Sequence, residues 1–340
     1  MRTMQPTPLE AWVKAKIGLP HAQQLTSRVL MDYQLEMLRG TLEYVKRNSP
    51  FYRRHLSAFS PDMLQSLQDL THWPLTTSDD LRRDPLAFLC VSQSAVERVV
   101  TLPTRSAAET PKRLFFSAAD LELAVDFFHH GFSTGVVPQG RMLVMMPCRT
   151  PYSVGDLLSR GLERLPAHPV RYGPMDSPEA VMETVRRESI DCLVGAPTEV
   201  AAVAQYANAS GFGSGRLRSI WLGTQNTRRS LADEIERSWG SPVFQHYGAA
   251  EMCPGGGVQC AARDGFHLRE ADLYIEIVDP VTARPLADGG FGEVVVTTLT
   301  REAMPLIRYR TGHGAAIMAD PCPCGGKLRR MTALRDRVNL

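Results

Sequence analysis

The sequence RMLVMMP at residues 141–147 opens the stretch that decides the fold, because short apolar runs and longer amphipathic runs alternate from here to residue 248. The helical pattern GDLLSRGLERL follows at 155–165, and PVRYG at 169–173 is the next apolar run. Further helical patterns and apolar runs occupy residues 178–189, 191–197, 198–209, 219–223, 229–239 and 242–248. Strands that alternate with helices of about ten to fifteen residues predict a largely parallel sheet with helices on its faces.

The flanking segments have different patterns. Residues 29–47 place apolar side chains at helical spacing, and residues 94–117 read as a strand, a polar turn and a second strand. Beyond residue 255, the alternating runs LYIEIVD and GEVVVTTL predict a small antiparallel sheet or barrel. We therefore expect an α/β protein with a helical region at 1–95, an α/β core at 96–254 and a β-rich subdomain at 255–340.

The composition is that of an ordinary globular chain. Of the 340 residues 44% are hydrophobic and 22% charged, and the formal net charge is +2, which gives no electrostatic case for nucleic-acid or membrane binding. No apolar run reaches the roughly 18 residues that a membrane-spanning helix needs, and residues 1–20 lack a signal-peptide pattern. We expect a cytoplasmic protein whose seven cysteines are reduced.

A set of cysteines and a histidine forms the sharpest local signal. Cys260 and His267 lie in CAARDGFH, and Cys322 and Cys324 lie in PCPCGG. Thiolate and imidazole are the ligands that zinc prefers, and four of them complete a structural site. The alternative is three unrelated cysteines and a solvated histidine, and the nearby Cys253 could substitute for one ligand.

Two further motifs have ordinary interpretations when each is taken alone. The string from Gln245 to Glu251, QHYGAAE, places an aromatic ring, a glycine turn and a carboxylate at a strand end, which fits a nucleotide site or a simple turn. The string from Pro305 to His313, PLIRYRTGH, could be a basic strand with solvated arginines.

Together and in this order, these segments resemble the adenylate-forming superfamily, and most closely its phenylacetate–CoA ligase and coenzyme F390 synthetase-like branch. The stretches 42–56 and 75–82 resemble the N-terminal region of that branch, and HYGAAEM resembles its Tyr-Gly-x-Thr-Glu motif. Residues 292–313 resemble its Gly-Glu to Arg-Thr-Gly-Asp segment nearly letter for letter. The branch is similar in its Cys/Gly-x-His and Cys-x-Cys-Gly elements, which favours structural Zn²⁺. The resemblance runs from about residue 30 to 340 and implies a large N-terminal adenylate-forming-type domain.

The resemblance implies a ligase that uses ATP and Mg²⁺ to convert a carboxylic acid, by family precedent an aromatic one, into an acyl-adenylate. A thiol, often CoA, then takes the acyl group. By position, Tyr247 would stack on adenine beside Gly248, and Gln245 would lie near the exocyclic amine. Gly223, Thr224 and Gln225 would line the other wall of the adenine site.

Other positions correspond to the remaining parts of such a site. Glu251 would ligate Mg²⁺, Tyr152 would border the acid pocket, and Arg335 would reach the ribose. A homodimer would fit the branch. The identity of the acid, the acyl acceptor and the oligomeric state do not follow from the sequence.

The stretch that corresponds to the phosphate-binding loop departs from the family pattern. Thr104, Ser106 and Lys112 could still face phosphate, but the stretch has no glycine and carries Glu109 where a phosphate would approach. Arg105 and Lys112 could compensate for this charge in part.

Further departures concern single residues and the end of the chain. His313 stands where the family has a ribose-binding Asp, and Ala250 stands where it has a Thr. The sequence ends about where the family hinge begins, so we expect the small C-terminal domain and its lysine to be absent. Three hypotheses follow: an acid-activating enzyme, weak alone or completed by a partner protein that supplies this domain; a degenerate ligase-like binding module for an acid, adenylate or nucleotide; or an interaction role in an assembly.

Overall fold

The computed structural model describes residues 5–20, 22–104, 109–211, 217–223 and 227–334. The α-helices in these ranges are α1 (Pro8–Lys16), α2 (Ser27–Asn48), α3 (Pro50–His55), α4 (Ser78–Arg83), α5 (Ala118–Phe132), α6 (Val154–Glu163), α7 (Pro178–Arg187), α8 (Pro197–Ala209) and α9 (Arg229–Trp239). The 3-10 helices are η1 (Pro61–Met63), η2 (Leu67–His72), η3 (Pro85–Phe88), η4 (Gln93–Ala95) and η5 (Ala250–Met252). None of the helices in these ranges is long and apolar enough to cross a membrane.

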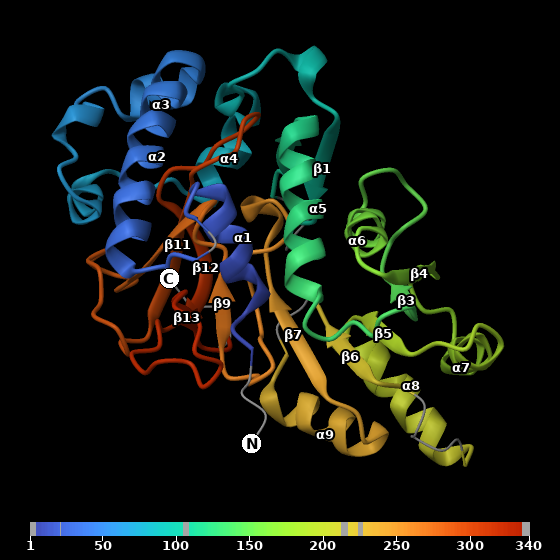
Figure 1. The fold of residues 1–340 in the computed structure, drawn as a ribbon. Coiled ribbons are helices and arrows are strands. Elements are labelled where there is room, and N and C mark those ends of the chain that lie inside the picture. The colour runs from blue at the N-terminus through green and yellow to red at the C-terminus, as the bar shows by residue number, and fades with distance from the viewer. Residues whose placement is uncertain (1–4, 21, 105–108, 212–216, 224–226, 335–340) are drawn as a thin grey trace.

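Three sheets organise the described chain. The largest has the strand order β13-β9-β8-β7-β6-β5-β3-β4, the second is the hairpin β1-β2, and the third is the antiparallel sheet β10-β11-β12. The strands are β1 (Arg98–Leu102), β2 (Lys112–Phe116), β3 (Gly140–Met145), β4 (Ala167–Arg171), β5 (Cys192–Gly195), β6 (Ser219–Leu222), β7 (Val243–Tyr247), β8 (Gly257–Val258), β9 (Phe266–Leu268), β10 (Leu273–Val278), β11 (Gly292–Thr298), β12 (Tyr309–Ala315) and β13 (Arg330–Met331). The mixed α/β architecture with small antiparallel sheets confirms the predicted fold class (Figure 1).

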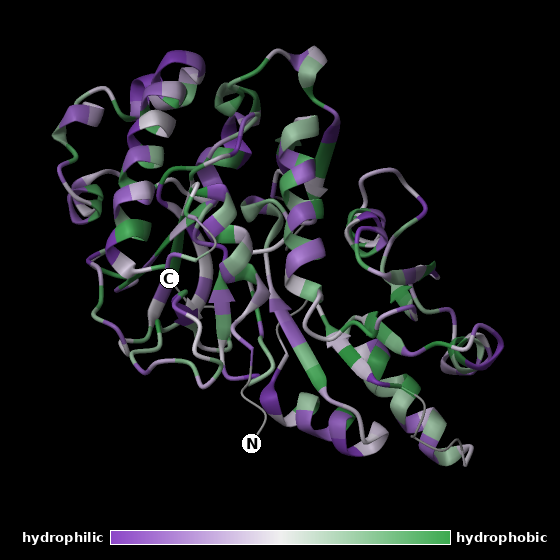
Figure 2. Ribbon diagram, in the orientation of Figure 1, coloured by the Kyte–Doolittle hydropathy of each residue, from purple (hydrophilic) through white to green (hydrophobic). Residues whose placement is uncertain are grey.

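The parallel part of the large sheet is buried on both faces. Pairings β4–β3, β3–β5, β5–β6 and β6–β7 are all parallel. On β3, Met142 and Val144 join the core that includes α5 and α6, whereas Leu143 and Met145 join the core formed with α7, α8 and α9. This alternation explains why the strands read as continuous apolar runs, and in Figure 2 β5 and β6 are mostly green while α9 alternates purple and green.

Strands from beyond residue 255 join the large sheet as well as the small one. β8 pairs antiparallel with β7, β9 with β8, and β13 with β9, so the large sheet continues across the predicted subdomain boundary. The three-stranded sheet is formed by β10, β11 and β12, as the alternating runs predicted. The division into three regions stays a prediction.

A buried ion pair ties the N-terminal helical region to the three-stranded sheet. Arg308, at the turn before β12, donates to both carboxylate oxygens of Glu276 on β10 at 3.1 and 2.9 Å. Its remaining amino group donates to the carbonyls of Thr71 and Trp73 at 2.9 and 2.6 Å. Burial raises the pKa of Glu276, and Arg308 opposes this shift. Both side chains are almost fully buried, so each charge requires the opposite charge of its partner.

We expect Glu276→Ala to destabilise the protein by about 3–5 kcal/mol, because it leaves the Arg308 charge buried without its partner. Asp32→Ala is the matched control, since the Arg28–Asp32 pair is exposed and should contribute less than about 1 kcal/mol. Urea unfolding of the two variants measures the difference. Equal midpoints would contradict this account of the pair.

Candidate functional site

Lys112 and Glu251 form the centre of a buried polar network at the carboxyl edge of the parallel sheet. The Lys112 ammonium, at the start of β2, donates to Glu251 Oε1 at 2.5 Å and to the Tyr309 hydroxyl at 3.0 Å. The Tyr309 hydroxyl lies 3.1 Å from the same Glu251 oxygen and 2.9 Å from the Ser78 hydroxyl. Two distant segments therefore meet the carboxylate of Glu251, and a third joins the network through Ser78, which contacts Tyr309 and Lys112.

The turn after β7 places Glu251 in this network. A Cβ on Gly248 would lie 2.6 Å from the backbone nitrogen of Gly255, so the turn has no room for a side chain there. Buried Arg301 then donates to the Glu251 carbonyl at 2.9 Å and to the Phe115 carbonyl on β2 at 3.0 Å. Arg301 thus fixes the backbone of Glu251 against the strand that carries Lys112.

The electrostatics favour an ionised Glu251. Burial acts to raise its pKa, but the charge and hydrogen bond of Lys112 and the Tyr309 hydroxyl lower the pKa below its ordinary value. A carboxylate that is only 8% exposed therefore remains charged at neutral pH. The site offers an ammonium group and a carboxylate side by side. The ammonium can bind the phosphates of a metal–nucleotide, and the carboxylate can bind its metal ion.

Tyr247 and His313 lie beside this network. The Tyr247 hydroxyl is 3.2 Å from His313 Nδ1, and the two rings meet edge to face with centroids 5.9 Å apart. Burial raises the pKa of Tyr247 and lowers the pKa of His313, so both groups are neutral at pH 7. The Tyr247 ring is itself buried and tilts against Phe266.

Glu293 holds the irregular part of β12 that carries His313, where the pairing with β11 shifts its register. Its carboxylate accepts from Arg310 and, at 3.0 Å, from the backbone nitrogen of Gly312, which has a φ of +72°. The Thr311 hydroxyl donates to the Val294 carbonyl at 2.7 Å. Because of such bonds, the arginines of the segment 308–313 are paired with other residues and are not solvated.

The predicted phosphate-facing residues lie in different places. Lys112 is in the network, Thr104 lies in the loop after β1, and Ser106 is outside the described residues. Glu109 pairs with Arg82 at 3.4 Å, so a residue from α4 offsets its charge, while Lys112 pairs with Glu251 instead.

The predicted adenine and ribose residues are only partly described. Thr224, Gln225 and Arg335 lie outside the described residues. Gly223 directly follows β6 and lies beside His246. Gln245 lines a polar cleft of about 310 Å³ together with α9 and Arg263.

Tyr152, predicted to border the acid pocket, lies in the loop between β3 and α6. Its φ is +60°, a left-handed conformation uncommon for a non-glycine residue, and its backbone nitrogen donates to Asp156 at 2.8 Å. The guanidinium of Arg160 lies 4.7 Å from the centre of its ring. The loop is thus held at the same sheet edge as Glu251.

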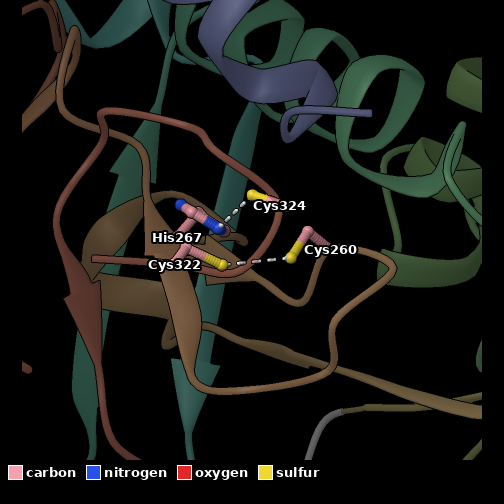
Figure 3. Close-up of side chains that lie close together, drawn as sticks. All are labelled: Cys260, His267, Cys322 and Cys324. Carbon is pink, nitrogen blue, oxygen red and sulfur yellow. Dashed lines mark hydrogen bonds between the residues drawn. The ribbon is translucent and has the colours of Figure 1, made fainter. Parts of the chain in front are cut away.

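Cys260, His267, Cys322 and Cys324 converge in a second cluster, with their side chains pointing toward one another (Figure 3). All four are buried, and their ligand atoms lie within 4.8 Å of one another. The Cys260 and Cys322 sulfurs are 3.6 Å apart, and Cys324 Sγ is 3.4 Å from His267 Nε2. A disulfide would place two sulfurs about 2.05 Å apart, whereas tetrahedral Zn–S bonds of about 2.3 Å place them about 3.8 Å apart.

The backbone around the cluster orients its ligands. His267 Nδ1 lies 3.3 Å from the Leu328 carbonyl, which leaves Nε2 facing the cysteines. The Gly326 backbone nitrogen donates to Cys324 Sγ at 3.4 Å. Cys253 is not part of the cluster, since its thiol donates to the Asp120 carbonyl at 2.8 Å. In the described part of the chain, no other group of three or more histidine, cysteine or acidic residues could hold a metal.

The sequence missed several members of the first network. Ser78 has no sequence-based role beyond its place in the stretch 75–82, and Tyr309 has none beyond its place in the motif 305–313. Arg301 and Glu293 carried no recognised role. The spacing of the motifs along the chain does not indicate that these side chains meet. The one signal was the family resemblance of segments 245–251 and 305–313, which implied that both belong to one site.

The fold and the network define the class of protein: an adenylate-forming enzyme fold with its nucleotide-type motifs gathered at the carboxyl edge of the sheet. The solved structure of a 2-hydroxyisobutyryl-CoA ligase with a bound acyl-adenylate superposes with a TM-score of 0.83 at 22% identity, covering 94% of this chain and 72% of that one. At this identity the likeness concerns the fold alone.

The AMP-binding enzyme family matches residues 111–300, and this chain belongs to that family. It is 28% identical to the phenylacetate–coenzyme A ligase of Thermus thermophilus over 94% of this chain and 73% of that ligase. It is 30% identical to the Escherichia coli enzyme of the same name over 83% of this chain and 66% of that enzyme. The predicted relationship to the phenylacetate–CoA ligase branch, and with it the class of adenylating acid–CoA ligases, is confirmed.

Proposed function

We propose that this chain binds ATP and a carboxylic acid, of an aromatic kind, and joins them as an acyl-adenylate. The observation that carries the proposal is the buried Lys112–Glu251–Tyr309 network beside Tyr247. Ligands of open α/β sheets bind outside the carboxyl ends of the strands, and this network occupies that edge. Membership of the AMP-binding enzyme family supports the same assignment.

In the proposed reaction, a carboxylate oxygen of the acid attacks the α-phosphorus of ATP and pyrophosphate leaves with the bonding electron pair. The protein acts mainly by positioning the two anions and offsetting their charge. Lys112 supplies a cation at the start of β2, and Tyr152 borders the acid. Tyr247, Gln245 and Gly223 contribute to the nucleotide side.

Mg²⁺ fits the proposed site through Glu251. Mg²⁺ in nucleotide sites is held by one or two carboxylates together with substrate phosphates, where it neutralises phosphate charge. Glu251 Oε1 already accepts from Lys112 and Tyr309, so a cation at this oxygen would require Lys112 to turn away toward the phosphates. The exchange of partners would couple metal–nucleotide binding to the position of Lys112.

The proposal extends to the acyl acceptor and to the assembly. CoA is the proposed acceptor, since the ligase relatives carry it in their names. A homodimer is proposed as the assembly, because it would fit the branch.

Zinc is proposed as a structural ion of the Cys260, His267, Cys322 and Cys324 cluster. Four buried N and S ligands with separations close to tetrahedral edges fit a closed site, which has no open position for catalysis. The ion would clamp the loop between β12 and β13 onto β9.

A second candidate is a binding module that holds an adenylate or nucleotide without turnover. The closed Lys112–Glu251 pair and the pairing of His313 with Tyr247 favour this alternative, because both engage groups that a nucleotide would otherwise use.

Calorimetric titration with ATP and Mg²⁺, and separately with AMP, tests the proposal, followed by pyrophosphate release with a panel of aromatic acids. We expect ATP binding, and release stimulated about tenfold or more by at least one acid. Binding of ATP or AMP without acid-dependent release would favour the binding module. Binding of neither nucleotide would contradict both candidates.

A further inference from the structure

Helix α1 brings a lysine to a carboxylate that is buried inside the protein. The Lys16 ammonium, in the last turn of α1, donates to Asp272 Oδ1, and the Asp272 side chain has no exposed surface. The Trp12 ring lies 5.3 Å from the ring of His130 on α5 and 5.0 Å from the Lys16 ammonium, which packs α1 against α5 (Figure 1). The N-terminal helix therefore supplies a positive charge to the interior.

Asp272 connects this charge to the turn that carries Glu251. The Nε atom of Arg269 lies 3.3 Å from Asp272 Oδ2, and both side chains are almost fully buried. The two amino groups of Arg269 donate to the carbonyls of Cys253 and Met252 at 3.4 and 3.2 Å. Met252 ends the 3-10 helix η5, and Cys253 follows it with a φ of +56°. Arg269 thus holds the backbone directly after Glu251.

A second link runs from Asp272 to the same turn through Thr300. The Thr300 hydroxyl donates to Asp272 Oδ1 at 2.7 Å, beside the Lys16 ammonium. The next residue, Arg301, donates to the Glu251 carbonyl at 2.9 Å. Both links from Asp272 therefore end on the backbone of Glu251 and of the two residues that follow it.

Lys16 decides how Arg269 is used. Arg269 Nε and Asp272 Oδ2 make no hydrogen bond within the residues that the structure describes, so the amino groups of Arg269 are committed to the turn and Lys16 supplies the donor for Asp272. A buried carboxylate that loses its charged partner is costly. Without Lys16, we expect the Arg269 amino groups to move toward Asp272 and to leave the two carbonyls of the turn.

We propose that Lys16 is a positioning residue of the adenylating site. By pairing with Asp272 it keeps Arg269 on the turn, and the turn keeps Glu251 where its carboxylate would meet Mg²⁺. This inference rests on the proposed function, in which Glu251 remains the residue that contacts the metal. The role requires a positive charge and a hydrogen-bond donor at residue 16, and arginine would retain both.

Hydrogen–deuterium exchange of the full chain tests the link from α1 to the turn. The backbone nitrogens of Met252 and Cys253 donate to the carbonyls of Ala249 and Ala250 at 3.0 and 3.1 Å, so their exchange reports on the turn. In Lys16→Met we expect residues 247–256 to exchange about tenfold faster, while α7 and α8 keep their wild-type rates. Lys16→Gln, which keeps a donor without the charge, takes the place of Lys16→Met in each measurement if the latter does not fold.

Calorimetric titration of ATP at increasing Mg²⁺ concentrations tests the consequence for Glu251. In Lys16→Met we expect the Mg²⁺ concentration for half-maximal ATP binding to rise about tenfold, while AMP affinity without Mg²⁺ changes by less than about twofold. Lys16→Arg should return the Mg²⁺ requirement to within about threefold of the wild type. In a Glu251→Gln background, Lys16→Met should have no further effect, because its effect passes through Glu251.

Lys46→Met is the matched control, because Lys46 on α2 is also partly buried but its ammonium donates to the Phe59 carbonyl, away from the turn. It should change neither the exchange at residues 247–256 nor the Mg²⁺ requirement.

Unchanged exchange at residues 247–256 in Lys16→Met would overturn the inference. Equal acceleration in α7 and α8 would also overturn it, since that result indicates a general loss of stability, as would a raised Mg²⁺ requirement that Lys16→Arg does not restore. Failure of the proposed function has a different signature: the turn would exchange faster in Lys16→Met, which supports the link from α1, yet the wild type would bind no ATP with or without Mg²⁺.

Discussion

Cys322→Ser is expected to lower zinc content from about one ion per chain to less than about a tenth, and to lower the melting temperature by about 10 °C or more. The serine removes one of four buried ligands, and the loop between β12 and β13 loses its attachment to His267 on β9. Metal binding to a structural site contributes directly to folding free energy. Elemental analysis of protein prepared without chelator and a thermal melt measure the two quantities.

Cys148→Ser is the matched control for removing a thiol, because Cys148 is partly exposed and lies outside the cluster. It should leave both zinc content and melting temperature unchanged. A wild-type protein without zinc, or a Cys322→Ser variant that keeps its melting temperature, would contradict the proposal that zinc holds the loop between β12 and β13 onto β9.

Glu251→Gln is expected to reduce Mg²⁺-dependent nucleotide binding and pyrophosphate release by about 100-fold while the fold is retained. The amide keeps the shape of the side chain but removes the charge that holds Lys112 and would hold the cation. Titration of ATP at increasing Mg²⁺ concentrations separates loss of the metal from loss of nucleotide affinity.

Glu188→Gln is the matched control, since Glu188, directly after α7, also pairs with a base, Arg141, but lies outside the network and the nucleotide side. Its Mg²⁺ dependence should equal that of the wild type. An unchanged Mg²⁺ dependence in Glu251→Gln would show that this carboxylate does not serve the metal.

Local patterns were sufficient for most of the α/β core. The helix at 29–47 is observed as α2 at Ser27–Asn48, and the run 229–239 is α9. The strand–turn–strand pattern at 94–117 is the hairpin of β1 and β2. These elements follow from period-2 and period-3.6 spacing of apolar residues, which short windows of sequence contain.

Local patterns failed for short elements beyond residue 255. β8 has two residues and β13 has two, too few for any periodicity, and their strand pairing depends on partners elsewhere in the chain. α1 was also missed, and its buried residues Leu9, Trp12 and Val13 gain their place by packing on the core.

The sequence by itself determined the alternation of strands and helices, the family resemblance and the residue types of the Cys/His cluster, because spacing and ligand chemistry are local properties. Only the tertiary structure decided that Lys112 pairs with Glu251, 139 residues away, and that Arg82 rather than Lys112 forms the ion pair with Glu109. It also decided that the His246 side chain packs against α5, whereas the neighbouring Tyr247 does not. Contacts between distant segments depend on how the sheet and helices pack, and no spacing within one segment encodes them.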